Sequence, residues 1–405
     1  MIKRELYLNQ LQEFIDKPLI KVITGIRRCG KSALLMLLRE ELLNRGVKEK
    51  QIIYLNFESL ENSDIDNSEK LYKFVREKIT GKNRYYLLLD EVQEVESWEK
   101  AVNTFFLDNK ADIYITGSNS RLLSSELATY LAGRYVEIHL YTLSFAESLI
   151  FRHADSPVKL GDLRQDFISY LRTGGFPVLQ LTDYSFETAG RIVFDIYSSI
   201  ILRDTVQRNN IRDVELLERV VRYVFDNIGN KFSAKNVADY FKSQQRRIDL
   251  NTVYNYLNAL ESAFIIYRIP RFDLRGKEIL KTLEKYYVGD VSLVYAVMGS
   301  GDRQISGILE NIVMLELLRR GYKVFTGKAD EREIDFIAEK NNEKVYIQVA
   351  FRMENQATID REFSPLLQIR DNHPKYVVTM DDIWHDNIEG IQHKHISDFL
   401  LMTNL

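Results

Sequence analysis

A glycine-rich run followed by a lysine and a serine stands early in the chain. Residues 25–32 read Gly-Ile-Arg-Arg-Cys-Gly-Lys-Ser and match the pattern G-x-x-x-x-G-K-[ST] in full. In this pattern backbone N–H groups wrap around phosphate oxygens, because glycine leaves no Cβ in the way. Lys31 then reaches the β- and γ-phosphates, and Ser32 places its hydroxyl on Mg²⁺. These residues therefore predict binding of a nucleoside triphosphate with its magnesium ion.

The neighbouring side chains extend this predicted site. Arg27 and Arg28 lie at the tip of the run, where they either contact nucleotide or stay solvated. We favour solvated or partner-facing side chains, because exposed charge is the default. Cys29 is interpreted as a small packed loop residue, since no second cysteine exists to resolve an oxidised form. The predicted nucleotide contacts are Gly25, Ile26, Arg27, Arg28, Cys29, Gly30, Lys31, Ser32, Ala33 and Ser118.

An apolar run that ends in two acids follows at residues 85–91. A buried strand here brings Asp90 to the carboxyl edge of a parallel sheet, beside the glycine-rich run. There Asp90 would hold Mg²⁺ together with Ser32, and Glu91 would polarise the attacking water. We predict Glu91 and Lys31 as catalytic residues for nucleotide hydrolysis. The alternative is a strand followed by an acidic turn.

Further polar residues are candidates for sensing the nucleotide. Ser118 or Asn119 follows another apolar strand and is placed to hydrogen-bond the γ-phosphate, although a polar turn explains the same residues. Asn56 ends an earlier strand and is a candidate for restraining Glu91. Arg134 is the third predicted catalytic residue, stabilising charge on the transferring phosphoryl group in cis or from a neighbouring subunit. The alternative for Arg134 is a surface arginine that caps a helix end.

Strands and helices alternate over the first third of the chain, and this alternation positions the candidate residues. Apolar runs predict strands at 19–24, 51–56, 85–90, 113–117 and 135–140, with helices such as 32–44 and 69–79 between them. Such alternation is typical of a mostly parallel sheet with helices on both faces. Residues 144–230 read as helical, and strands return at 322–326, 334–339, 345–350 and 376–379. The predicted fold class is α/β with several domains.

Length and composition exclude several classes of protein. The chain has 405 residues, which suggests two to four domains. Its 45% hydrophobic and 28% charged residues exclude a disordered chain. A net charge of −3 argues against a generally basic nucleic-acid-binding surface, although a local basic face stays open. The chain has one cysteine, no apolar signal-peptide core and no run long enough to span a membrane. We expect a cytoplasmic protein without membrane association.

Together these motifs resemble a known group of proteins. The group is the prokaryotic AAA-type ATPases, in particular the archaeal-type ATPases allied to signal-transducing (STAND-like) ATPases. The resemblance is carried by residues 25–32, 90–93, 116–118 and 132–134. Gly-Gly-Phe-Pro at 174–177 and Lys-Tyr-Tyr at 285–287 with Asp290 resemble the C-terminal region that usually accompanies this ATPase. The resemblance spans nearly the whole chain and implies ATP and Mg²⁺ as cofactors, but it says little about biological role.

A basic segment over residues 231–275 has the order of a winged helix-turn-helix: helix 234–242, turn 243–249, helix 251–263 and strand 264–269. Its eight Lys/Arg and four Asp/Glu give a net charge of +4. In a DNA-binding interpretation, polar side chains near the start of the second helix face a groove, and arginines hold phosphates. The alternative is a packing or dimerisation module. The groove-facing candidates are Asn251, Thr252, Tyr254 and Asn255, and the phosphate-binding candidates are Arg246, Arg247, Arg271 and Arg275.

The last part of the chain resembles the restriction-endonuclease-like PD-(D/E)xK superfamily. Glu310 lies on a predicted helix, Asp335 lies in a predicted strand, and the next strand carries Gln348 and Ala350. In that superfamily Asp and Glu hold a metal while Lys positions the attacking water. Here Gln348 stands at the Glu position and Ala350 at the Lys position, which weakens Mg²⁺ binding and removes a fixed positive charge. We predict a fold kept for binding or scaffolding without nuclease activity, with Glu310 and Asp335 still candidates for weak metal binding.

The predicted organisation has four parts. They are a P-loop ATPase domain at 1–149, a helical segment at 150–230, a winged helix-turn-helix at 231–275 and a restriction-endonuclease-like domain at 276–405. Three functions stay open: an ATP-driven DNA-associated machine, a signalling switch that binds proteins, and an ATP-regulated nuclease. In the first two, Mg-ATP hydrolysis drives a conformational change. The predicted partners are double-stranded DNA through residues 231–275 or a protein, and the chain is a candidate homo-oligomer.

Overall fold

The chain forms two compact units in a computed structural model. The first unit comprises residues 1–142 with 262–264, and the second comprises 143–261 with 265–405. The predicted helical, winged-helix and C-terminal parts thus belong to one unit, and the first unit ends at residue 142 rather than 149. The structure describes residues 1–81, 83–120, 131, 133–154, 163–243, 248–274, 276, 278–299, 305–329, 332–382 and 387–405. Ala132, Arg246, Arg247 and Arg275, which were singled out above, lie outside these residues.

A five-stranded parallel sheet lies at the centre of the first unit, in the order β2-β3-β4-β1-β5. This confirms the predicted parallel sheet and adds one fact about it: β4 lies between β1 and β3. Because all five strands are parallel, their carboxyl ends meet at one edge. The strands are β1 (Ile20–Thr24), β2 (Ile52–Asn56), β3 (Tyr85–Asp90), β4 (Ala111–Gly117) and β5 (Tyr135–His139).

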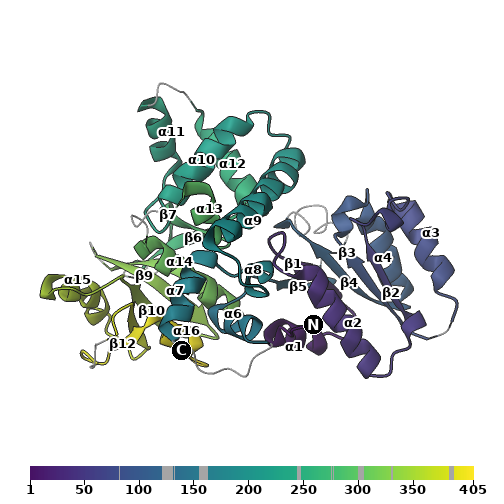
Figure 1. The fold of residues 1–405 in the computed structure, drawn as a ribbon, viewed down its shortest axis with the longest axis horizontal. Coiled ribbons are helices and arrows are strands. Elements are labelled where there is room, and N and C mark those ends of the chain that lie inside the picture. Colours follow the sequence, from purple (N-terminus) through teal and green to yellow (C-terminus); the bar gives the residue numbers. More distant parts are fainter. Residues whose placement is uncertain are drawn as a thin grey trace. The chain divides into compact units, whose positions relative to one another are not determined.

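Helices cover both faces of this sheet (Figure 1). Helices α3 (Ser68–Lys78) and α4 (Trp98–Asp108) pack on one face, where α3 contributes Leu71 and Val75, spaced by one helical turn, to an apolar core. Asn67 caps α3, because its side chain accepts hydrogen bonds from the first-turn amides. The other helices of this unit are α1 (Glu5–Glu13) and α2 (Lys31–Asn44), with short 3₁₀ turns η1 (Glu49–Gln51), η2 (Leu60–Asn62) and η3 (Val92–Glu94).

Helices make up the first half of the second unit. Helix α10 is amphipathic, because it buries Leu217, Val220, Val221 and Val224 at helical spacing. The helices are α6 (Phe145–Arg152), α7 (Leu163–Thr173), α8 (Pro177–Gln180), α9 (Phe186–Ser199), the π-helix η5 (Ile200–Gln207), α10 (Val214–Asp226), α11 (Ala234–Ser243), α12 (Leu250–Ser262) and α13 (Ser292–Met298).

A seven-stranded mixed sheet holds the rest of the second unit together, in the order β12-β11-β10-β9-β8-β6-β7. The predicted return of α/β structure is confirmed. β8, β9 and β10 run antiparallel, whereas β10, β11 and β12 run parallel. The strands are β6 (Ile266–Asp273), β7 (Glu278–Val288), β8 (Lys323–Ala329), β9 (Arg332–Lys340), β10 (Glu343–Val349), β11 (Lys375–Thr379) and β12 (Gln392–His395), and the helices are α14 (Ile305–Arg319), α15 (Gln356–Leu367) and α16 (Ile396–Leu401).

The strand predicted as a wing is part of this seven-stranded sheet. Helices α11 and α12 have the predicted helix-turn-helix order, but β6 pairs with β7 on one side and with β8 on the other. Both edges of the β6 backbone are therefore used inside the sheet. The predicted boundary at residue 275 falls within the β6–β7 hairpin, so the segment 231–275 is not a separate module with a projecting wing.

Candidate functional sites

The glycine-rich loop lies between β1 and α2, at the carboxyl edge of the five-stranded sheet. Gly25 and Gly30 have φ angles of 149° and 108°, and Arg28 has a φ of 69°. A Cβ on Gly25 would lie 2.2 Å from the carbonyl oxygen of Leu140, so only glycine fits there. Such a run of unusual backbone angles turns successive amides toward an anion. The predicted strand–loop–helix context of the phosphate-binding run is confirmed.

Asp90 is fully buried at the end of β3, and its carboxylate is held by three side chains. The Tyr54 hydroxyl and Asn56 Nδ2 donate to Asp90 Oδ2 at 3.0 and 3.2 Å. Thr116 Oγ1 donates to Asp90 Oδ1 at 2.6 Å and accepts from the Glu91 amide at 2.8 Å. A carboxylate offers about four acceptor positions. The three bonds therefore fix Asp90 and leave an acceptor position for a metal-bound water.

Lys31 and Glu91 meet at this edge. Lys31 Nζ lies 3.3 Å from Glu91 Oε1 and donates to the carbonyl oxygens of Gly25 at 3.0 Å and Ile26 at 3.4 Å. Glu91 itself has a φ of 54°, a conformation that a non-glycine residue adopts when its surroundings hold it there. The structure thus brings Lys31, Asp90 and Glu91 together as predicted from the sequence.

The environment of Glu91 favours its ionised form. Burial raises the pKa of Glu91, but the Lys31 ammonium, the Gln93 amide and the Arg27 guanidinium outweigh burial and bring the pKa below its usual value. The carboxylate is therefore charged near neutral pH. A group that accepts a hydrogen bond from an attacking water must be in this state.

The two arginines at the loop tip differ. Arg27 is only 6% exposed, and its Nη1 donates to Glu58 Oε1 at 2.6 Å. The prediction of a solvated Arg27 is wrong, because Glu58 supplies a partner that makes burial of the charge tolerable. Arg28 is exposed as predicted. Cys29 is buried as predicted, and burial raises the pKa of its thiol, which keeps the thiol protonated and unreactive.

The remaining loop residues and the predicted sensors also lie at this edge. Ser32 is half-buried in the first turn of α2, and Ala33 beside it is exposed. Ser118 and Asn119 are fully buried directly after β4, and their role toward a γ-phosphate stays a prediction. The hypothesis that Asn56 restrains Glu91 is wrong in this structure. Its Nδ2 is bonded to Asp90, and its Oδ1 accepts from the Glu58 amide at 2.9 Å.

Arg134 lies at the opposite edge of the sheet. Its carbonyl oxygen accepts from the amide of Ile20, the first residue of β1, whereas the phosphate-binding loop follows the last residue of that strand. A strand of this length separates the two by on the order of 15 Å. Arg134 Nη1 donates to Asn103 Oδ1 at 2.8 Å, and its guanidinium lies over the ring of Phe106. The predicted catalytic role in cis is therefore wrong, and a role from a neighbouring subunit stays a prediction.

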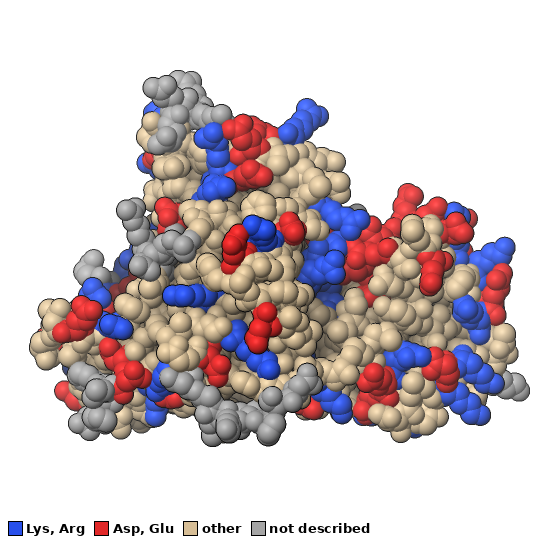
Figure 2. All heavy atoms as spheres, viewed as in Figure 1, with Lys and Arg blue, Asp and Glu red and all other residues tan. Residues whose placement is uncertain are grey.

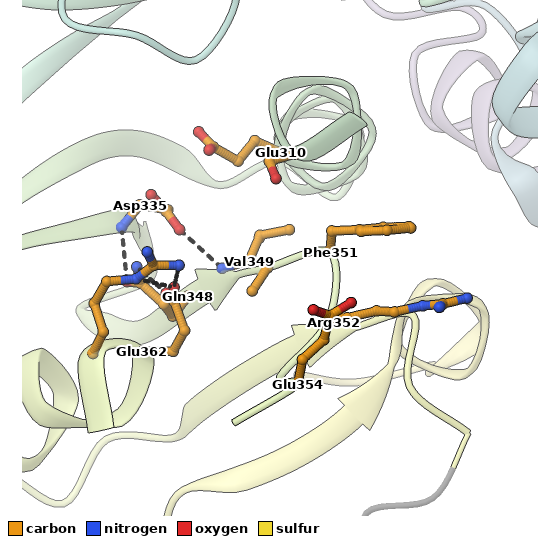
Figure 3. Close-up of a pocket in the computed structure, with 11 residues that line it drawn as sticks. Glu310, Asp335, Gln348, Val349, Phe351, Arg352, Glu354 and Glu362 are labelled. Atoms are coloured by element: carbon orange, nitrogen blue, oxygen red, sulfur yellow. Dashed lines mark hydrogen bonds and ion pairs between the residues drawn. The ribbon is translucent and has the colours of Figure 1, made fainter. Parts of the chain in front are cut away.

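A second polar cluster lies in the second unit and lines a pocket of about 360 Å³ (Figure 3). Glu310 on α14, Asp335 on β9, Gln348 on β10 and Glu362 on α15 contribute to it. Gln348 Oε1 accepts from the Asp335 amide at 3.3 Å, and Gln348 Nε2 donates to Glu362 Oε2 at 2.9 Å. The residues that were compared with the nuclease superfamily thus lie together. Within the described ranges, no group of three or more His, Cys, Asp or Glu side chains is arranged to hold a metal ion.

A buried lysine from the motif at 285–287 stands beside this pocket. Lys285 Nζ on β7 lies 2.7 Å from Glu333 Oε1, 3.2 Å from Glu310 Oε2 and 3.4 Å from Asp335 Oδ1. Burial lowers the pKa of Lys285, but the surrounding acidic groups outweigh it and raise that pKa well above its ordinary value. Burial, aided by Asp335, raises the pKa of Glu310 to about 8. Tyr287 donates to Glu310 Oε2 at 2.8 Å.

The two motifs that resemble the accompanying C-terminal region meet each other. Asp290 Oδ2 accepts from the Gly175 amide at 2.8 Å. A Cβ on Gly174 would lie 1.9 Å from Asp290 Oδ1, and one on Gly175 would lie 2.2 Å from the carbonyl oxygen of Leu143. Gly174 also has a φ of 64°. These glycines are therefore required by close packing inside the second unit.

Several contacts of both sites were not predicted from the sequence. Tyr54 and Glu58 belong to the nucleotide site, and Glu333 belongs to the acidic cluster. Thr116 and Lys285 were named only as parts of the family motifs 116–118 and 285–287, without a role in either site. No sequence signal marked Glu58 as the partner of a loop residue.

The glycine loop, the acidic end of β3 and the intervening β4 define a P-loop nucleotide-binding unit of the AAA class. A family model described as an AAA domain matches residues 17–149. A domain of unknown function, DUF8612, matches residues 164–304 and crosses the predicted boundaries at 230 and 275. This second range agrees with a single second unit.

Two relatives match along most of their length. An uncharacterized protein of Haemophilus influenzae is 40% identical over 402 residues, which cover 99% of each chain. The uncharacterized protein MJ1544 of Methanocaldococcus jannaschii is 32% identical over 355 residues, which cover 85% of this chain and 77% of the relative. The chain belongs to the same family as these two proteins, with an AAA domain as its first part.

A solved structure shares the fold. The Walker-type ATPase PABY2304 of Pyrococcus abyssi aligns with 74% of this chain and 96% of its own, with a TM-score of 0.53 and 16% identity. Among the helices that the structure describes, none is long and apolar enough to cross a lipid bilayer.

Proposed function

We propose that the chain binds Mg-ATP at residues 25–33 and hydrolyses it, and that the bound nucleotide changes the conformation of the chain. The main support for this proposal is the position of three side chains at the carboxyl edge of the five-stranded sheet. Lys31, Asp90 and Glu91 lie together there, beside the backbone amides of the glycine-rich loop. An AAA domain over residues 17–149 supports the same conclusion.

Each residue has one part in the proposed reaction. Loop amides and the Lys31 ammonium would bind the β- and γ-phosphates, and the Ser32 hydroxyl and Asp90 would hold Mg²⁺, which would neutralise phosphate charge. On binding ATP, the Lys31 ammonium exchanges its contact with the Glu91 carboxylate for a contact with the phosphates. Glu91 then accepts a hydrogen bond from the attacking water, whose oxygen forms the new bond to the γ-phosphorus as the bond to the leaving oxygen breaks.

The first experiment measures ATP binding and hydrolysis for the parent chain and two variants. Glu91→Gln should bind ATP and hydrolyse it about 10²- to 10⁴-fold more slowly, because the amide is a poor base. Lys31→Ala should lose affinity, because the ammonium grips the triphosphate directly. The exposed Glu96 offers a matched control as Glu96→Gln. The proposal fails if the parent chain has no affinity for nucleotide, or if Lys31→Ala keeps that affinity undiminished.

Double-stranded DNA is the first partner that we propose for the second unit. Helix α12 exposes Asn251, Tyr254 and Asn255, the predicted groove-facing side chains. The charge of the segment contributes less than predicted, because Lys231 pairs with Glu333, an acid outside the segment. Arg271 lies half-buried in β6, which has a partner strand on each side, and its role as a phosphate contact stays a prediction. Figure 2 shows acidic and basic side chains interspersed on one face of the chain.

Hydrolysis measured with and without duplex DNA decides between the two classes of partner. Stimulation that is lost in Asn251→Ala/Asn255→Ala supports DNA. Absence of any DNA binding at low salt, where phosphate attraction is strongest, supports a signalling switch with a protein partner. A homo-oligomer, including one in which Arg134 acts on a neighbouring subunit, is tested by comparing the mass in solution with and without ATP.

A metal-dependent nuclease is a second candidate function, and one observation favours it. Lys285 supplies from β7 the ammonium that is missing at Ala350, and it lies within 3.4 Å of Asp335 and Glu310. Gln348 in place of a carboxylate weighs against this function, as does the pairing of the Lys285 ammonium with three acids. Mg²⁺-dependent cleavage of DNA that disappears in both Asp335→Ala and Lys285→Ala would establish it.

A further inference from the structure

A buried arginine stands directly before the first helix. Arg4 is 4% exposed. Its Nη1 donates to the carbonyl oxygen of Cys29 at 3.1 Å and to that of Tyr141 at 2.9 Å, and its Nη2 donates to that of Thr142 at 3.3 Å. One guanidinium therefore joins the phosphate-binding loop to the last two residues of the first unit. The planar fork of donors on arginine is suited to bridging several fixed acceptors.

Tyr7 strengthens the same link from the first turn of α1. Its ring lies 4.5 Å from the Arg4 guanidinium, and its hydroxyl accepts a hydrogen bond from the Tyr141 amide at 3.3 Å. Tyr7 is 2% exposed, so the stacked pair is shielded from water. Residues 140–142 are thus bonded to the loop region through Arg4 and through the Leu140 amide, which donates to the carbonyl oxygen of Thr24, directly before the loop, at 2.7 Å.

The chain then enters the second unit at Leu143, whose backbone is held within that unit. The Leu143 amide donates to the carbonyl oxygen of Gly175 at 2.7 Å, and its own carbonyl oxygen accepts from the Tyr170 hydroxyl at 2.9 Å. Residues 140–143, which we call the connector, are therefore bonded to the loop region at their start and to the second unit at their end.

One peptide unit, between Cys29 and Gly30, joins an amide of the phosphate-binding loop to the carbonyl that Arg4 binds. The carbonyl of Cys29 and the N–H of Gly30 belong to one planar trans peptide and point to opposite sides. A phosphate that turned the Gly30 N–H would therefore turn the Cys29 carbonyl that Arg4 holds. The same guanidinium would pass that rotation to Tyr141 and Thr142, whose carbonyl oxygens it also binds.

We infer that Arg4 is a positioning residue that sets the phosphate-binding loop and couples its conformation to the connector. The inference rests on the nucleotide binding proposed above. It identifies the hydrogen bonds of Arg4 as the contacts that would carry the conformational change. Arg4 lies outside residues 17–149, which match the AAA domain, so this coupling is an addition to that domain.

Hydrogen–deuterium exchange of the full chain tests the inference, with and without Mg²⁺ and a non-hydrolysable ATP analogue. In the parent chain the analogue should slow exchange in the loop and also in residues 143–180. In Arg4→Gln the loop should still respond, while the response of 143–180 is lost. We expect hydrolysis to fall about 10- to 100-fold through misplacement of the loop, with little change in nucleotide affinity. Arg4→Lys keeps one donor and the charge, and should restore part of the response.

A matched control comes from Arg84→Gln. Arg84 also bonds the N-terminal segment, through Asp16 at 2.9 Å, but it lies directly before β3, at the other edge of the sheet. This variant should keep the response of residues 143–180. If Arg4→Gln does not fold, Tyr7→Phe, which removes only the acceptor of the Tyr141 amide, takes its place and should weaken the response.

The outcomes separate the two proposals. A parent chain that binds no nucleotide overturns the proposed function and this inference with it. A parent chain that binds the analogue without any change in residues 143–180 overturns the coupling and the conformational switch, but not ATP binding. If Arg4→Gln responds in residues 143–180 as the parent does, the role of Arg4 is overturned and the proposed function stands.

Discussion

At the scale of single residues, the nucleotide site depends on groups that hold the catalytic side chains as much as on those side chains. Asp90 and Glu91 follow one another in sequence, yet one hydroxyl on the neighbouring strand touches both. Thr116 donates to the Asp90 carboxylate and accepts from the Glu91 amide, in a place where water does not reach. Loss of this hydroxyl leaves a buried acceptor and a buried donor without their partner.

We therefore expect Thr116→Val to lower the rate of ATP hydrolysis by about 10²-fold, as for other losses of a fixed donor in an active site. Nucleotide affinity should change much less, because the loop amides and Lys31 are untouched. Steady-state hydrolysis and equilibrium binding measure the two quantities. Thr104→Val on α4, whose hydroxyl bonds only within its helix, is the control. Equal rates for the Thr116 variant and the parent would contradict the assignment.

The acidic cluster of the second unit predicts a pH dependence of stability. The pKa of Glu310 is raised from 4.5 to about 8 by burial, with Asp335, Lys285 and Tyr287 facing the same carboxyl. Between these two values the folded chain keeps a proton that the unfolded chain has lost. The free energy of unfolding should therefore fall as the pH rises from 4.5 toward 8. Asp335, whose pKa is also raised by burial, acts in the same direction.

Urea unfolding at several pH values, followed by circular dichroism, checks this dependence. Glu310→Gln should flatten the slope, because an amide has no proton to lose and still accepts the bond from Tyr287. Glu343→Gln at an exposed position of β10 should leave the slope unchanged. A parent chain whose stability does not decline over this range would show that Glu310 is ionised in the folded state.

At the scale of elements, close packing between segments far apart in sequence explains the glycines of the second unit. Gly174→Ala should lower the free energy of unfolding by about 1–3 kcal/mol or more, because the new methyl group overlaps Asp290 and the backbone is left-handed. Gly190→Ala inside α9 meets nothing within 4 Å and should instead raise it by about 0.5–1 kcal/mol. Denaturant unfolding measures both, and equal effects would refute the packing argument.

The elements of the first unit were the most predictable part of the chain. Apolar runs bounded by turns placed all five strands, with β3 at 85–90 matched at both ends. The helices predicted at 234–242 and 251–263 correspond to α11 and α12. The strand β6 was assigned to a wing because a helix-turn-helix precedes it. Its partner strands come from residues 278–288 and 323–329, and sequence order alone does not give such pairings.

The parts of the nucleotide site that form contiguous sequence motifs were predictable. Residues 25–32 and 90–91 gave the loop and the acidic pair because their spacing follows from phosphate and metal geometry. The predicted catalytic role of Arg134 in cis was wrong because Arg134 lies directly before β5, at the end of the sheet away from the phosphate-binding loop. The sequence alone does not show at which end of the sheet such a residue lies. Arg4 was not predictable because its partners lie 25 to 138 residues away and are backbone carbonyls, which have no residue type. Lys285 was named only as part of a family motif, and its contacts with Glu310 and Asp335, 25 and 50 residues away, were not predicted.

At the scale of the whole molecule, the chain consists of one nucleotide-binding unit and one larger unit that is continuous across the predicted domain boundaries. The relative in Haemophilus influenzae covers both units, so the pairing of the two parts is shared within the family. The connector at 140–143 is one of the covalent links through which the proposed nucleotide-driven change would pass from one unit to the other.

Lys285 has a further consequence for the chemistry open to the second unit. Its ammonium is a counter-ion carried by the polypeptide itself, and it faces the carboxylates of Glu310, Glu333 and Asp335. The variant Lys285→Met would remove the positive charge from this cluster, and burial would then favour the protonated forms of the remaining acids. One side chain thus balances the charge of several buried acids inside the second unit.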